Sequence, residues 1–95
     1  MAHGRYPVAI DLSSEDYEAP DDAQGNPIPF QLNCAEGGLV SVKLVDDASA
    51  FTEMYFNAGD NPALVIAVDD DSTMTDGLVA IFPYKPATTT INTTY

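Results

Sequence analysis

Aspartates are the residues of this chain with the most potential for chemistry. The densest group is the run Asp69-Asp70-Asp71, and two acidic pairs occur elsewhere, Asp21-Asp22 and Asp46-Asp47. Loop carboxylates are the hard oxygen ligands that Ca²⁺ prefers, so Asp69 and Asp71 are candidate calcium ligands. The calcium-loop spacing D-x-(D/N)-x-(D/N)-G is absent, because Thr73 and Met74 break it. We therefore expect a solvated turn whose aspartates bond nearby amides, and neither a metal nor another cofactor.

Nucleophilic catalysis needs a base beside the nucleophile, and the chain offers almost none. His3 is the only histidine and lies near the N-terminus. Cys34 is the only cysteine, and its neighbours Phe30 and Leu32 predict a small buried apolar role for it. One cysteine and one histidine also exclude a four-ligand structural zinc site. We expect no enzymatic activity.

The positions of these residues are set by strands. Alternation of apolar and polar residues predicts a strand over Leu39–Val45, with Val40, Val42 and Leu44 on one face. Continuous apolar runs predict two central strands that are covered on both faces, by the other sheet or by a neighbouring subunit. The remaining expected strands are weaker and aromatic or alternating. The two apolar runs are Ala63–Val68 and Leu78–Phe82. The two weaker expected strands are Phe51–Phe56, which is aromatic, and Phe30–Cys34, which alternates.

Short strands separated by Gly-, Pro-, Asn- and Asp-rich turns are typical of a small β-sandwich or barrel. Helix is conceivable only over Ser13–Asp22, and Pro20 limits it to one turn or less. We expect a single all-β antiparallel domain. It consists of an N-terminal arm with a first short strand (residues 1–29), a β core (30–84) and a Thr-rich C-terminal arm (85–95).

The charge excludes several partners. The chain has fifteen acidic and three basic residues, with a formal net charge of −12. Nucleic acids and anionic membranes both attract clustered Lys and Arg, so neither is expected as a partner. A 95-residue chain without disulfides has little core for its surface, which favours oligomerisation as an additional source of stability.

Aromatic and apolar side chains in the strands and arms are the expected contacts with partners. The arms Ala2–Tyr6 and Thr88–Tyr95 extend the reach of the chain without a larger core. The candidate interface residues are Tyr6, Tyr55, Phe56, Ile91 and Tyr95. Exposed tyrosines could alternatively form a platform for a sugar, although Trp is missing.

The order of these segments resembles small virion proteins of tailed phages and gene transfer agents, of the spike-base or capsid-decoration type. The resemblance covers about residues 7–84 and rests on the order of strands and turns. Its clearest parts are the N-A-G-x-x-P turn at Asn57–Pro62, before Ala63–Val68, and the Thr-rich turn at Ser72–Gly77, before Leu78–Phe82. The run Asp69–Asp71 departs from the pattern, where a basic, Gly or Thr residue is expected.

The resemblance implies a non-enzymatic structural role on a virion, for a β domain made in the host cytoplasm. The implied partners are further copies of the chain, with a trimer favoured, and the major capsid protein or another virion protein. The alternative is a receptor- or glycan-binding β module on a virion or cell surface.

Overall fold

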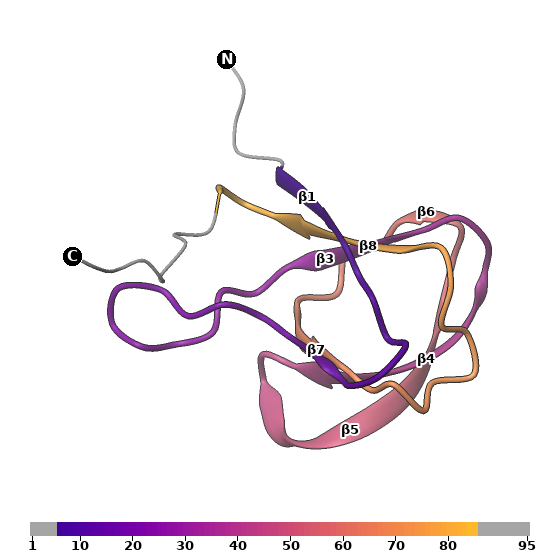
Figure 1. The fold of residues 1–95 in the computed structure, drawn as a ribbon, viewed down its shortest axis with the longest axis horizontal. Coiled ribbons are helices and arrows are strands. Elements are labelled where there is room, and N and C mark those ends of the chain that lie inside the picture. Colours follow the sequence, from indigo (N-terminus) through magenta and orange to yellow (C-terminus); the bar gives the residue numbers. More distant parts are fainter. Residues whose placement is uncertain (1–5, 86–95) are drawn as a thin grey trace.

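The computed structural model describes residues 6–85, which form an antiparallel all-β sandwich of two four-stranded sheets (Figure 1). The first sheet contains, in spatial order, β1 (Tyr6–Ala9), β8 (Leu78–Phe82), β3 (Gln31–Cys34) and β6 (Gly59–Asp60). The second contains β2 (Tyr17–Glu18), β7 (Val65–Val68), β4 (Gly38–Leu44) and β5 (Asp47–Phe56). Each sheet has two edges, so the sandwich is open. The expected all-β sandwich is confirmed.

The core lies between the two sheets and is built from the inward residues of β3, β4, β7 and β8. Phe30 connects the layers, because its backbone exchanges two hydrogen bonds with Val65 of the second sheet, at 2.8 and 2.9 Å. Its ring packs against Phe82 of the first sheet and meets Tyr17 edge-on. The largest fully buried side chains are Phe30, Phe56, Phe82, Leu32, Val40, Val42, Val65, Val68 and Cys34.

Three expected strands, over residues 30–34, 39–45 and 78–82, correspond closely to β3, β4 and β8. β5 begins at Asp47, earlier than the aromatic run predicted, so the turn before it is Val45-Asp46. β2 and β6 were not expected, because each has two residues and little apolar character. Residues 6–85 contain no helix, so the turn considered over Ser13–Asp22 does not form, and that range offers no helix able to cross a membrane.

The two continuous apolar runs differ in how the chain covers them. All four residues of β7 are buried, as expected for a central strand covered on both faces. β8 alternates instead: Leu78, Ala80 and Phe82 are buried, whereas Val79 and Ile81 are half-buried on the outer face. One copy of the chain therefore leaves an apolar part of β8 in contact with solvent.

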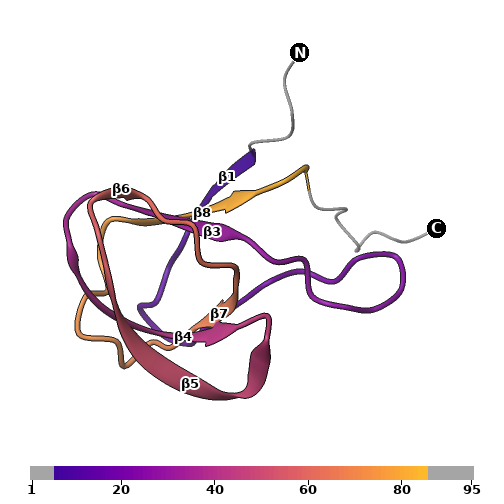
Figure 2. The same ribbon diagram turned by 180° about the vertical axis from the view of Figure 1, so that it is seen from behind.

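The two termini of the described chain lie side by side. Tyr6 at the start of β1 pairs with Phe82 at the end of β8, and both views show these strands adjacent, with β5 on the opposite side of the sandwich (Figures 1 and 2). The long segment between β2 and β3 extends to one side, beyond the sheets. A bridge between Asp21 and Pro27 closes it.

Candidate functional site

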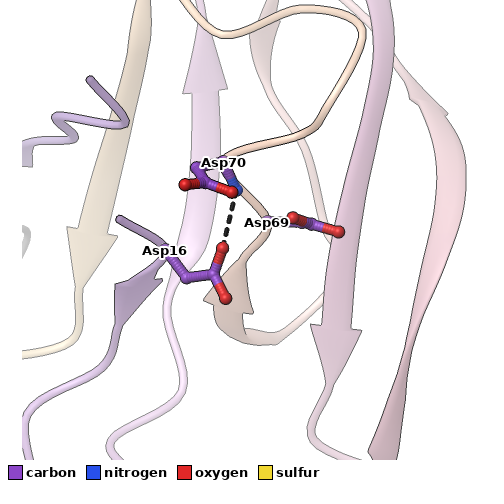
Figure 3. Close-up of side chains that lie close together, drawn as sticks. All are labelled: Asp16, Asp69 and Asp70. Carbon is purple, nitrogen blue, oxygen red and sulfur yellow. Dashed lines mark hydrogen bonds between the residues drawn. The ribbon is translucent and has the colours of Figure 1, made fainter. Parts of the chain in front are cut away.

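Strand pairing assembles an acidic cluster from two distant segments. Tyr17 of β2 lies opposite Val68 of β7, so the next residue out on each side brings Asp16 to Asp69. Carboxylate oxygens of Asp16, Asp69 and Asp70 all lie within 4.8 Å of one another. Figure 3 shows the three side chains at the end of β7, with the backbone N–H of Asp70 donating to Oδ1 of Asp16 at 2.8 Å.

The cluster changes the proton affinity of its central member. Partial burial raises the pKa of Asp70 above its ordinary value of 3.8, and the hydrogen-bonded Asp16 carboxylate raises it further. The charges of Asp71 and Asp69 act in the same direction. Ca²⁺ takes about six to eight oxygen ligands in proteins, so one oxygen from each of three carboxylates fills at most half of its coordination and would bind such a cation weakly.

The cluster differs from the pair that the sequence indicated. Asp69 belongs to it, but Asp71 does not: Asp71 is exposed, and its backbone N–H donates to Oδ1 of Asp69 at 2.9 Å. Asp16 and Asp70 were missed. Asp16 is 54 residues from Asp70, so only the pairing of β2 with β7 could have indicated it.

Other aspartates use the same local hydrogen bond as Asp69. Asp11 accepts the backbone N–H of Ser13, and Asp22 accepts those of Gln24 and Asn26, all at 2.9 to 3.0 Å. The bonds to Ser13 lower the pKa of Asp11. A carboxylate that accepts the N–H two residues ahead stabilises a turn. Turn formation thus explains part of the aspartate content without a bound ligand.

Two buried polar residues fix the turns on which the resemblance rests. Asn61 is 5% exposed; its side-chain N–H groups face the carbonyls of Asn57 and Gly59 at 3.0 and 3.1 Å, and its Oδ1 accepts the N–H of Asn57. Ser72 accepts the N–H of Ser41 on β4 and donates to the carbonyl of Asp69. Neither role has a signal in the sequence, because both residues occur in turns rich in polar residues.

Cys34 is buried, as expected, beneath the Asn57–Pro62 turn. Asn61 Nδ2 lies 3.9 Å from its Sγ. Burial raises the pKa of the Cys34 thiol, which opposes formation of the thiolate. This environment is that of a core residue and not of a nucleophile.

The candidate interface residues fall into three groups. Tyr55 is 62% exposed on β5 and lies opposite Leu39 of β4, which is 40% exposed, and Tyr6 is exposed on β1. Phe56 is 1% exposed, which corrects its place among the interface candidates, because its side chain faces the core. Ile91 and Tyr95 lie outside the described residues, as does His3.

An open groove of about 470 Å³ runs beside the turn before β8. Its lining combines the acidic side chains of Glu36 and Asp76 with threonines and Met74, and a smaller hollow adjoins it on the other side of Thr75–Gly77. Neither hollow is lined by a histidine, a cysteine or a basic residue.

Comparison of the chain with protein-family models, with curated proteins and with solved structures yields no match.

Proposed function

We propose that this protein is a non-enzymatic structural component of a phage-like particle, which works as an oligomer and decorates or cements the capsid surface or forms a spike base. The observation that carries this proposal is the open sandwich with an exposed apolar surface. β5 has ten residues and, within residues 6–85, pairs only with β4. The exposed pair Leu39 and Tyr55 lies at one end of this hairpin. Open strand edges and exposed aromatic side chains are typical sites of contact with other chains.

The side-chain chemistry supports a structural role over a catalytic one. Cys34 is buried with a raised pKa, and the carboxylates of Asp11, Asp22 and Asp69 bond to backbone amides in turns. A general acid–base pair would need carboxyl groups in a cavity that can hold a substrate. The groove beside Glu36 and Asp76 is open, so it does not exclude water from them.

Particles purified from the organism that encodes the chain provide the test. We expect quantitative mass spectrometry to find the chain in many copies per particle, and immunogold labelling to place it on the particle surface. Particles that form and infect normally but contain none of the chain would contradict the proposal.

A truncated chain ending at Lys85 tests the predicted role of the C-terminal arm. We expect it to keep the melting temperature of the β core and to bind particles at least about tenfold more weakly, because an extended arm adds contact area without adding core. Full decoration by the truncated chain would remove residues 86–95 from the attachment surface.

A further inference from the structure

The acidic residues of this chain are unevenly distributed along the sequence. All fifteen occur between Asp11 and Asp76, and the segments on either side contain none. Those flanking segments contain two of the three basic residues, Arg5 and Lys85. The fold places the described parts of these segments together, because β1 comes from the first and β8 from the second, and the two strands pair directly.

The pairing produces an outer surface without acidic residues over β1, β8 and β3 of the first sheet. Pro7 and Ala9 of β1 lie opposite Ile81 and Val79 of β8. On its other side β8 pairs with β3, where Gln31 and Asn33 occupy the same two rows. We call this surface the acid-free face; its residues are Pro7, Ala9, Val79, Ile81, Gln31 and Asn33.

The apolar part of this face is accessible in one copy of the chain. Pro7 and Ala9 are exposed, and Val79 and Ile81 are half-buried. The nearest carboxylate in the ladder is that of Asp60 on β6, at the rim, where it accepts a hydrogen bond from Asn33 Nδ2 at 2.7 Å. Toward β1 the face ends near Lys85, whose Nζ lies 6.0 Å from the centre of the Tyr6 ring.

The outer surface of the second sheet differs in charge. Glu53 of β5 lies opposite Ser41 there, and Lys43 contacts the ring of Phe51 at 5.0 Å. The acidic cluster of Asp16, Asp69 and Asp70 lies at the end of the same sheet. The outer surface that combines accessible apolar side chains with an absence of carboxylates is therefore the acid-free face of the first sheet.

We propose that the acid-free face is the contact surface between copies of this chain, with the face of one copy against the same face of another. The inference rests on the oligomeric part of the proposed function. Two copies that each carry a charge of −12 repel, and at physiological salt this repulsion decays over about 8 Å. An approach through the acid-free face buries apolar area without burying a carboxylate of the face itself.

The face is favoured over the neighbouring strand edge for a chemical reason. β1 is the edge strand on this side, and it contains Pro7. Proline has no N–H to donate to an added strand, and natural sheets use it to block edge-to-edge pairing. A head-to-tail contact, in which the acid-free face of one copy meets the acidic cluster of another, is disfavoured too. None of the six residues of the face is basic, so the face cannot neutralise the cluster.

A charge introduced at one exposed position tests the contact. We expect Ala9→Glu and Ala9→Lys each to raise the dissociation constant of the oligomer at least about tenfold in sedimentation equilibrium, since like charges would then face each other across the contact. Mixing the two variants should restore association, because opposite charges then meet. Ala9 is exposed on a short edge strand, so circular dichroism and melting temperature should stay close to those of the parent chain.

Val45→Glu is the matched control, because it places a carboxylate at an exposed apolar position next to the second sheet, outside both the acid-free face and the surface of Leu39 and Tyr55. Under the proposal it leaves association unchanged. Dissociation by Leu39→Glu but not by Ala9→Glu would overturn the proposal and assign the contact to the surface of Leu39 and Tyr55. Ile81→Glu, in the middle of the face, gives an independent repeat.

A parent chain that is monomeric at all concentrations would also overturn the inference. If the full chain is monomeric but a chain truncated after Lys85 associates, residues 86–95 of the same copy cover the acid-free face in the full chain. Particle binding separates this failure from that of the proposed function: Ala9→Glu protein that still decorates particles leaves the structural role intact.

Discussion

At the scale of single residues, the polar side chains that matter most for the fold are the few that are buried. Asn61 joins the Asn57–Pro62 turn to the first sheet through bonds of its side chain and of its own N–H, which donates to the carbonyl of Leu32 at 3.0 Å. Ser72 does the same for the loop between β7 and β8, through Ser41. Both side chains reinforce a connection to a sheet that backbone hydrogen bonds also make.

Asn61→Ala should lower the free energy of unfolding by about 2 kcal/mol. The carbonyls of Asn57 and Gly59 would lose their donor, and the Asn57 N–H would lose its acceptor. The midpoint and slope of urea denaturation measure this loss. Asn57→Ala is the control, since Asn57 contributes to these bonds through its backbone. Equal losses for the two variants would contradict the role assigned to the Asn61 side chain.

Asp70 is predicted to destabilise the fold at neutral pH. Its pKa is raised in the folded state, so the folded chain binds the Asp70 proton more tightly than the unfolded chain does, and stability at this site falls as the pH rises above 3.8 through the raised value. Asp70→Asn should therefore raise the melting temperature at pH 7, and the gain should vanish below the unfolded-state pKa of 3.8.

Asp46→Asn is the matched control for this prediction, because it removes the same charge from an exposed position in the β4–β5 turn. Thermal unfolding of both variants across the acid range separates a local effect from a general one. If Asp70→Asn raises the melting temperature no more than Asp46→Asn does, the gain comes from the lower net charge. A loss would show that the Asp70 carboxylate stabilises the loop.

At the scale of the elements, the sequence predicted strands well where side-chain pattern determines burial. The alternation of Val40 and Val42 with Ser41 anticipated β4, because inward residues must be apolar whatever the partner strand is. It did not predict β2, whose two residues Tyr17–Glu18 become a strand only through pairing with β7. The acidic cluster was missed for the same reason, since Asp16 reaches Asp69 through that pairing.

The turn that leads into β8 gives a prediction about glycine. Gly77 has φ +74°, and a Cβ there would approach the Cβ of Ala35 to 2.9 Å. Gly77→Ala should cost about 2 kcal/mol or more, from the left-handed backbone and the overlap together. Gly25 has φ +84° but no atom within 4 Å of its position for a Cβ, so Gly25→Ala should cost about 1 kcal/mol. Chemical denaturation that finds equal costs would contradict the contact with Ala35.

At the scale of the whole molecule, net charge should limit stability and association alike. With a formal charge of −12, the compact state repels itself, and salt screens this repulsion. We expect the melting temperature to rise when sodium chloride is increased from low to physiological concentration, as measured by circular dichroism. A melting temperature independent of salt would mean that the carboxylates are already far enough apart in one copy.

We expect this small open sandwich to function as an assembly of copies. The most direct test is the native mass of the full chain by light scattering, in calcium and in EDTA. We expect a mass that is an even multiple of the 10.1 kDa chain in both solutions, because contact between like faces joins copies in pairs. An oligomer that forms only in calcium would instead assign a cation-binding role to the carboxylates of Asp16, Asp69 and Asp70. A stable 10.1 kDa monomer in both solutions would contradict the claim.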